Sequence, residues 1–297
     1  MHRRSFLPSL ALLPFSGFPM HWNTFRHWAD KLRPSPRMPV LFLGHGSPMN
    51  AIEENTFVAG FRTVAASLPR PQAILCISAH WETDGTFLTA MEQPRTIHDF
   101  HGFPPALHAV RYPAPGSPAL ALETCSLLQA EQASPDASLW GLDHGAWSVL
   151  VHLFPDADIP VVQMSLDRRK SPGAHYAMAR NLAPLRRKGI LIIGSGNMVH
   201  NLGRVDWNQL DTPGYAYDWA AEAHQRMCRF VLDRQHQALV DYTDQGPAFR
   251  LAVPTPEHYL PLLYTLGLQE EHDRTELFND LAIGGSLTMT SVKLEPA

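Results

Sequence analysis

The sequence has few charged residues, few cysteines and no long apolar run, and each shortage excludes a class of protein. Charged residues are 18% of the 297 residues, and the formal net charge is -4, which gives no electrostatic footprint for nucleic acid or an anionic membrane. The three cysteines, Cys76, Cys125 and Cys228, are widely spaced and form neither a disulfide framework nor a zinc ribbon. No apolar run reaches the roughly 18 residues that span a bilayer. We expect no nucleic-acid or membrane partner, and no pattern specifies an oligomeric state.

Hydrophobic residues and histidine are plentiful by contrast. Hydrophobic residues make up 45% of the chain, which is enough for a sizeable core and excludes disordered and fibrous classes. The chain also has 16 histidines. Because histidine is the commonest metal ligand and proton-transfer side chain, the positions of these residues carry most of the functional information.

Residues 1–37 are expected to be a leader outside the fold. Arg3 and Arg4, followed by an apolar segment, are similar to a twin-arginine export signal. The segment is short, contains Pro8 and Pro14, and is not followed by a clear small-residue cleavage site. We therefore expect a cytoplasmic protein with a vestigial leader, and periplasmic export through the twin-arginine route is the alternative.

Strand-like and helix-like segments alternate from residue 38 to residue 297. Short apolar runs predict strands at 40–43, 73–77, 86–91, 159–166, 190–193 and 286–294. Apolar residues at helical spacing predict helices at 57–68, 117–130, 174–188, 215–239 and 255–266, with Pro184 as a possible break. The alternation predicts a single α/β domain with a central, mostly parallel or mixed sheet flanked by helices.

Three of the predicted strands run into segments that contain His45, His80 and His200. In open α/β sheets, ligands bind beyond the carboxyl ends of the strands. A single histidine there is more often a hydrogen-bonded structural residue. His45 and His80, however, end successive buried strands and are predicted to lie side by side, as two adjacent metal ligands must.

Other histidines have more than one interpretation. His144 follows Asp143 and is either part of the site or a helix-start residue capped by that aspartate. His98 either lines the site or closes a loop, whereas His224 and His236 are interpreted as solvent-facing. The Glu257-His258 pair lies at a predicted helix start and offers both a carboxylate and an imidazole.

Seven segments together resemble a known family. They are LGHGSPMN (43–50), ISAHW (77–81), TIHDF (96–100), YPAPG (112–116), GLDHGAW (141–147), SGNMVHNL (195–202) and TPEHYLP (255–261). In this order they are similar to the class III (LigB-type) extradiol ring-cleavage dioxygenases, in the 4,5-DOPA extradiol dioxygenase branch. The resemblance runs from about Met38 to the C-terminus and implies that residues 38–297 form an extradiol dioxygenase catalytic domain.

The resemblance implies O2-dependent opening of a catechol ring by a metal-dependent enzyme. It implies non-haem Fe2+ in the active form, and Zn2+ is expected in the isolated protein because imidazole also suits zinc. A catechol occupies two metal positions and O2 a further one, so the protein supplies about three ligands on one face. The resemblance assigns His45 and His80 as two ligands and His258 as the third, with Glu257 as its partner or its alternative.

The resemblance also implies roles in catalysis and substrate binding. His200 is the expected base for the catechol hydroxyl, and it is expected to reach the metal as a fourth ligand when no substrate is bound. It follows Gly194, Ser195 and Gly196, which we interpret as a flexible turn. His144 is the second catalytic histidine. The expected substrate-binding residues are Trp81, His98 and Tyr259, although such aromatic residues more often belong to the core.

Two other classes of function fit the same residues. One is a zinc-dependent hydrolase in which Glu257 serves as base, and the other is a non-enzymatic metal-binding relative. The sequence identifies neither the catechol nor the ring bond that is cleaved.

Overall fold

The computed structural model describes residues 35–297, and the expected export signal within residues 1–34 lies outside this part. Eight strands form one sheet in the order β4-β3-β5-β2-β6-β1-β10-β7. Four central strands are parallel, namely β5 (Val161–Asp167), β2 (Ala73–Thr83), β6 (Ile190–Gly196) and β1 (Val40–Gly44). The edges add antiparallel neighbours, so the sheet is mixed, as predicted.

The outer strands are short or polar. On one side β3 (Phe87–Thr89) pairs with β5 antiparallel and with β4 (Ser134–Asp136) parallel. On the other side β10 (Ser291–Pro296) pairs antiparallel with both β1 and β7 (Asp273–Phe278). A separate hairpin joins β8 (Ala282–Ile283) to β9 (Leu287–Thr288).

Side chains alternate between the two faces of the sheet, and each face carries its own core. Val40 and Phe42 of β1 belong to one core, whereas Leu41 and Leu43 belong to the other, as the two-residue period of a strand requires. The first core is covered by α4 (Pro118–Leu127), α6 (Pro172–Ala179), α7 (Ala183–Arg186), α8 (Asp218–Leu232), α9 (His236–Val240), α10 (Pro247–Ala252) and α11 (Leu260–Gly267).

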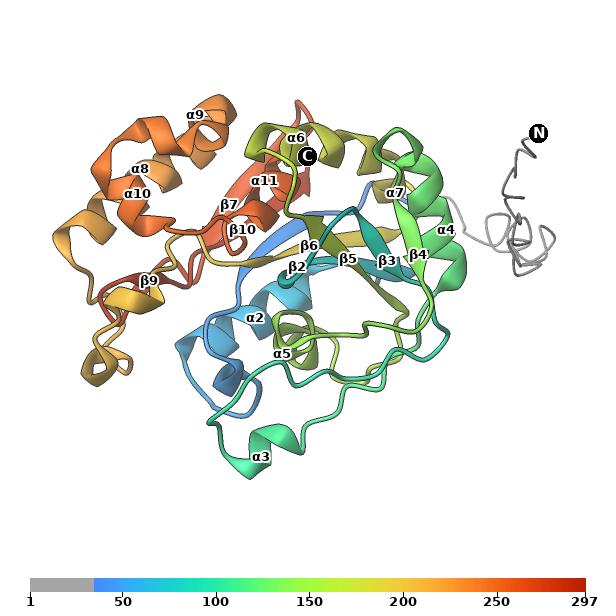
Figure 1. Cartoon of the computed structure of the whole chain (residues 1–297), viewed down its shortest axis with the longest axis horizontal. Helices are drawn as coiled ribbons and strands as arrows, with labels where there is room; N and C mark the ends of the chain where they lie inside the picture. The colour runs from blue at the N-terminus through green and yellow to red at the C-terminus, as the bar shows by residue number, and fades with distance from the viewer. Residues whose placement is uncertain (1–34) are drawn as a thin grey trace, which may run out of the picture.

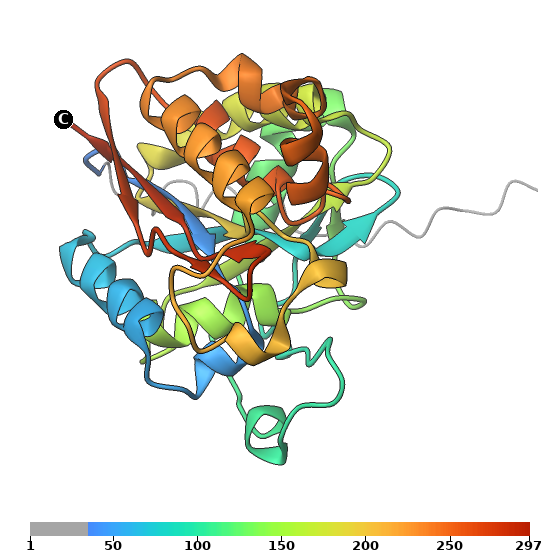
Figure 2. The ribbon, with the colours of Figure 1, turned by 90° about the vertical axis from the view of Figure 1, so that its left-hand side faces the viewer.

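The second core is covered by α2 (Thr56–Ser67), α3 (Pro105–His108) and α5 (His144–Leu153). Figures 1 and 2 show α2 and α8 on opposite sides of the sheet. Helix starts follow local signals: Asn55 caps α2 through its side chain, and Ser117 caps α4 ahead of Pro118. The predicted α/β class is therefore confirmed.

Two predicted helices are interrupted. The helix expected over 174–188 ends at Ala179 and resumes as α7 after a 3-10 turn. Pro184 is the physical reason, because it has no N–H to donate to the carbonyl four residues earlier. The helix expected over 215–239 is divided into α8 and α9, and Arg234 between them has a left-handed φ of 56°.

Two further predictions of extent are wrong. The helix expected from residue 255 begins at Leu260, because bends at 254–256 and a turn at 257–259 come ahead of it. The strand expected over 286–294 is two strands, β9 and β10, with Met289 and Thr290 between them. No helix among residues 35–297 is long and apolar enough to cross a membrane.

A buried ion pair joins the first residues of the domain to β7. Arg186 donates to both carboxylate oxygens of Asp273, at 2.7 and 3.1 Å, and its Nε donates to the carbonyl of Met38 at 2.9 Å. Both charged side chains are fully buried. Arg37, which the sequence places in the leader, also donates to Asp273, at 2.8 Å. The packed structure therefore includes residue 37.

The substitution Arg186→Met should destabilise the protein strongly, because it leaves the Asp273 carboxylate buried with one partner fewer. Breaking a buried pair typically costs about 3–5 kcal/mol. The matched control is Arg187→Met, which removes a half-exposed pair with Glu270 and should cost no more than about 1 kcal/mol. Urea unfolding of both variants measures the difference, and equal small losses would contradict the prediction.

Candidate metal centre

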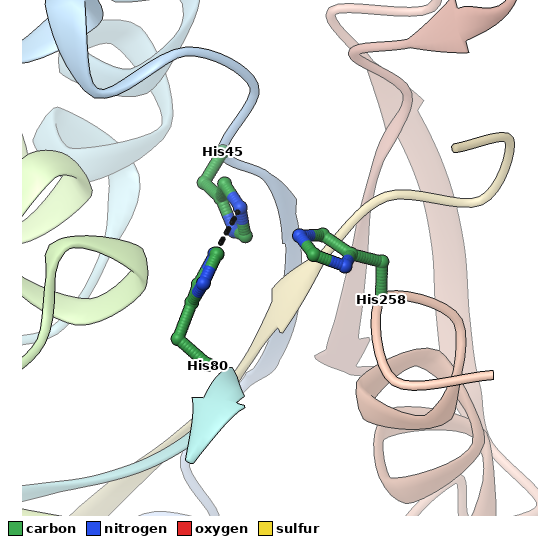
Figure 3. Close-up of side chains that lie close together, drawn as sticks. All are labelled: His45, His80 and His258. Carbon is green, nitrogen blue, oxygen red and sulfur yellow. Dashed lines mark hydrogen bonds between the residues drawn. The ribbon is translucent and has the colours of Figure 1, made fainter. Parts of the chain in front are cut away.

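Five histidines meet at the carboxyl ends of the central strands. His45 follows β1, His80 lies in β2, His144 begins α5, His200 follows β6, and His258 precedes α11. Ring centroids are 5.0 Å apart for His45 and His80, 4.9 Å for His80 and His258, and 5.3 Å for His45 and His258. Figure 3 shows these three rings facing one another. The predicted closeness of His45 and His80 is confirmed.

The route by which His45 and His80 come together differs from the prediction. Their strands are not neighbours, because β6 lies between β1 and β2. His80 also does not end its strand: β2 continues to Thr83, and its pairing with β5 shifts register between Ile77 and Glu82. A shift of this kind re-aims side chains, and here it occurs around His80.

The Nδ1 atom of His45 is held by Ser195. His45 Nδ1 and Ser195 Oγ are 3.0 Å apart, and the Ser195 hydroxyl donates to the Gly145 carbonyl at 2.5 Å. Because a hydroxyl has one proton to donate, Ser195 accepts from Nδ1–H of His45. The Nε2 atom of His45 therefore carries a free lone pair.

A carboxylate holds the ring of His258 in the same way, and another carboxylate lies near the ring of His80. His258 Nδ1 is 3.1 Å from Glu257 Oε1, and His80 Nδ1 is 3.5 Å from Asp99 Oδ2. The Glu257 carboxylate accepts, so His258 carries its proton on Nδ1 and has its lone pair on Nε2, whereas the 3.5 Å separation from Asp99 is too long to fix the tautomer of His80. Outer partners that fix the tautomer of a histidine in this way are typical of metal-binding imidazoles.

The free nitrogens of the three rings fit a metal ion. Nε2 of His45 and Nε2 of His80 are 3.1 Å apart, so either a proton on His80 Nε2 or a cation lies between the two nitrogens. One ligand atom from each of His45, His80 and His258 lies within 4.8 Å of the others. Three neutral imidazoles on one side of an ion match an open site.

Burial keeps these imidazoles uncharged. Burial, followed by the neighbouring histidines, holds the pKa of His45 and of His80 well below the usual range. The pKa of His258 is also lowered by burial, although Glu257 partly opposes this. For His200, burial and then His258 lower the pKa to about 3. The rings are therefore neutral near pH 7, as metal ligands must be.

Glu257 is an orienting partner in this arrangement. Burial would raise its pKa, but hydrogen bonds, first from His258, bring it down to about 2. Its Oε1 also accepts from the hydroxyl of Thr255 at 2.9 Å. The group of His45, His80 and His258 is complete without Glu257, although Glu257 forms a second group of possible ligands with His200 and His258.

His144 combines both roles that the sequence leaves open. Asp143 caps α5 by accepting from Ala146 N at 3.1 Å, while the ring of His144 lies 3.9 Å from the ring of His80. Asp99 accepts from the backbone N–H of His144 at 2.8 Å and from its Nδ1 at 2.9 Å. Burial would raise the pKa of Asp99, but these hydrogen bonds lower it on balance.

Asp99 and Ser195 are the orienting residues to which the sequence assigns no role. Both lie inside segments that carry the family resemblance, and that position was the available signal.

Gly145 allows α5 to pack closely against the histidine centre. A Cβ at this position would lie 2.6 Å from Ser78 Oγ and 2.8 Å from a ring carbon of His80. Only glycine lets α5 approach the centre this closely.

His200 lies against the third predicted ligand. Its ring stacks on that of His258, with centroids 3.6 Å apart and an interplanar angle of 11°. The predicted flexible turn before it is wrong, because Gly194, Ser195 and Gly196 are buried residues of β6. The backbone N–H of His200 also donates to Ala252 at 2.8 Å.

The three predicted substrate-binding residues lie in different surroundings. Trp81 is buried and stacks on Trp140, with centroids 5.6 Å apart. His98 Nε2 lies 3.0 Å from the Val110 carbonyl. Tyr259 is buried in the core, where its hydroxyl donates to the Leu239 carbonyl at 2.8 Å. Contact with substrate stays a prediction for all three, and the placement of Tyr259 is that of a core residue.

The family match and the similar proteins both indicate aromatic ring-opening dioxygenases. Residues 38–289 match the family described as the catalytic LigB subunit of aromatic ring-opening dioxygenase. The chain is 46% identical over 268 residues to the Escherichia coli protein named 4,5-DOPA dioxygenase extradiol, covering 89% of this chain and 97% of that protein. The Beta vulgaris protein of the same name is 36% identical over 262 residues, covering 86% and 95%.

A solved structure agrees with the fold. The crystal structure of an uncharacterized protein from Escherichia coli superposes with a TM-score of 0.74 at 43% identity, covering 86% of this chain and 99% of that one. The family match includes all five histidines of the centre. The chain therefore belongs to the LigB family of aromatic ring-opening dioxygenases.

Proposed function

We propose that this chain is an extradiol dioxygenase that opens the ring of a DOPA-like catechol with O2, using Fe2+ held by His45, His80 and His258. The observation that carries the proposal is the set of three neutral imidazoles that each bring one ligand atom to within 4.8 Å of the others, with the Nδ1 atoms of His45 and His258 held by Ser195 and Glu257. The substrate class is supported by the name of the relatives, 4,5-DOPA dioxygenase extradiol.

The ligand set suits both substrates of this reaction. Three uncharged ligands leave the full positive charge of the ion to attract a catecholate, and ligands on one side leave the other positions open. Bound Fe2+ would supply coordination of the catechol oxygens and the redox chemistry that O2 requires. The same imidazoles bind Zn2+ readily, so we expect zinc in protein isolated without added iron.

His200 is the proposed base for the catechol hydroxyl proton. Its ring is neutral and therefore has a lone pair, and it lies against His258 at the edge of the centre. His144 is proposed to orient the substrate. Because its Nδ1 proton is directed to Asp99, its Nε2 is an acceptor facing away from the carboxylate, which makes His144 the alternative base.

The function is tested with protein that is loaded with Fe2+ under anaerobic conditions and then mixed with O2 and a panel of catechols including DOPA. We expect oxygen uptake and a yellow ring-opened product with Fe2+, and neither with Zn2+, which has no redox chemistry. Equal turnover of the Zn2+ form without oxygen uptake would favour the hydrolase. Metal binding without turnover in either form would favour the non-enzymatic relative.

The ligand set is tested by substitution. His45→Ala, His80→Ala and His258→Ala should each lose most of the bound metal and keep a native circular dichroism spectrum, because each removes one of three ligands. His101→Ala is the matched control, since His101 is an exposed histidine outside the centre. Glu257→Gln should retain metal and lower activity modestly. Loss of metal in Glu257→Gln but not in His258→Ala would make Glu257 the ligand.

His200→Ala should separate the base from the ligands. Loss of a general base costs about 10²–10⁴-fold in rate, so turnover should fall by that range while Fe2+ and catechol still bind. Metal analysis and catechol titration of the same preparation measure the two properties separately. If this variant loses metal as completely as His80→Ala, His200 is an ordinary ligand and the base is His144.

A further inference from the structure

A second group of potential metal ligands lies where α8 meets the connection between β7 and β8. His224 and Cys228 belong to α8, and Asp280 belongs to the connection. His224 Nε2 is 2.7 Å from Asp280 Oδ1, and Cys228 Sγ is 3.5 Å from the same oxygen. One ligand atom from each residue lies within 4.8 Å of the others. None of the three belongs to the histidine centre.

The local structure explains why these side chains converge. His224 and Cys228 are four residues apart on a helix, so they lie on the same face, one turn apart. Thr290, between β9 and β10, closes the group, because its hydroxyl is 2.7 Å from His224 Nε2 and 3.0 Å from Asp280 Oδ1. The prediction that His224 faces solvent is therefore wrong: its side chain is 14% exposed.

The same prediction for His236, which lies outside this group, is also wrong. His236 is partly buried, and its Nδ1 is 3.0 Å from the hydroxyl of Tyr176.

The donor types select among metals. Imidazole, thiol and carboxylate form the nitrogen, sulfur and oxygen set that zinc uses, and a sulfur ligand disfavours Mg2+ and Ca2+. Tetrahedral zinc, with bonds of about 2.0–2.3 Å, places its ligand atoms roughly 3.4–3.6 Å apart. The sulfur and oxygen atoms are already 3.5 Å apart. His224 Nε2 and Asp280 Oδ1, which are 2.7 Å apart, have to separate by less than about 1 Å.

We propose that His224, Cys228 and Asp280 bind a second metal ion of the zinc type, separate from the catalytic centre. Asp280 has a side chain that is 43% exposed, which gives an ion access and leaves room for water as the fourth ligand. Cys228 is mostly buried, so its sulfur forms the inner wall of the site. This inference does not rest on the proposed dioxygenase function.

The expected role of this ion is structural. It would tie α8 to Asp280 in the connection between β7 and β8, and the Thr290 hydroxyl links Asp280 to the segment 287–290, which also contacts the histidine centre. Leu287 in that segment forms a β-bridge with His200. Met289 packs against the loop of His45, since a Cβ on Gly44 would lie 2.5 Å from the Met289 carbonyl oxygen. A bound ion would therefore make the segment 287–290, which contacts the histidine centre, more rigid.

Cobalt distinguishes the two centres, because Co2+ replaces zinc and only a sulfur ligand gives an intense near-ultraviolet charge-transfer band. Titration of metal-free full-length protein should bind two Co2+ per chain and develop this band. Cys228→Ser, His224→Ala and Asp280→Asn should each reduce the stoichiometry to one, and Cys228→Ser should abolish the band. His80→Ala should also bind one Co2+ but keep the band.

Matched controls exclude indirect effects. Cys125→Ser removes a partly exposed cysteine elsewhere, and it should keep both ions and the band. Circular dichroism verifies that each variant is folded. A folded wild-type protein that binds one Co2+ without a charge-transfer band would overturn the second site, and so would a band that persists in Cys228→Ser. If His224→Ala lowers the thermal stability but leaves the number of bound Co2+ ions unchanged, the group is a set of stabilising hydrogen bonds and not a metal site.

Discussion

The carboxyl end of β6 holds the two halves of the histidine centre in place through its backbone. The Gly196 carbonyl accepts from the backbone N–H of His45 at 3.1 Å, and the N–H of Asn197 donates to the His258 carbonyl at 2.8 Å. A Cβ on Gly196 would collide with that same His258 carbonyl. Two predicted ligands that are distant in sequence are thus fixed by one short segment, which is paired with β1 in the sheet.

Burial of so many imidazoles dictates how the rest of the site is built. A buried imidazole costs little only when it is neutral and its N–H has a partner. Ser195, Asp99 and Glu257 supply those partners on the Nδ1 side. Satisfying one nitrogen of each ring leaves the other as a bare lone pair, and several bare lone pairs facing one another are favourable only around a cation. These hydrogen-bond partners therefore favour a cation at the remaining ring nitrogens, although none of the partners needs to contact it.

The sequence predicted the features that depend on local pattern. Buried strands read as apolar runs, so β1, β2, β5 and β6 and the histidines near their ends were predicted, and the family motifs supplied His258. Asp99 holds His144 from a distant position in the sequence, and hydrophobic periodicity does not report such a contact. The edge strand β7 was missed because its sequence, Asp273–Phe278, is largely polar. His224 was predicted to face solvent, because its partner Asp280 is distant in sequence.

The antiparallel edge of the sheet has a function beyond extending it. After α11 the chain returns through β7, β8, β9 and β10, and the short segment around Met289 reaches the centre from this side. Gly44 has no side chain where Met289 packs, and Gly46 adopts a left-handed φ of 62° beside the Met289 sulfur. The loop that carries His45 is consequently shaped by residues from the last strands, while Leu287 fixes the backbone of His200. The segment around Met289 therefore sets the distance between the predicted ligand His45 and the predicted base His200. In a parallel α/β core without this segment, the two residues would lie on independent loops.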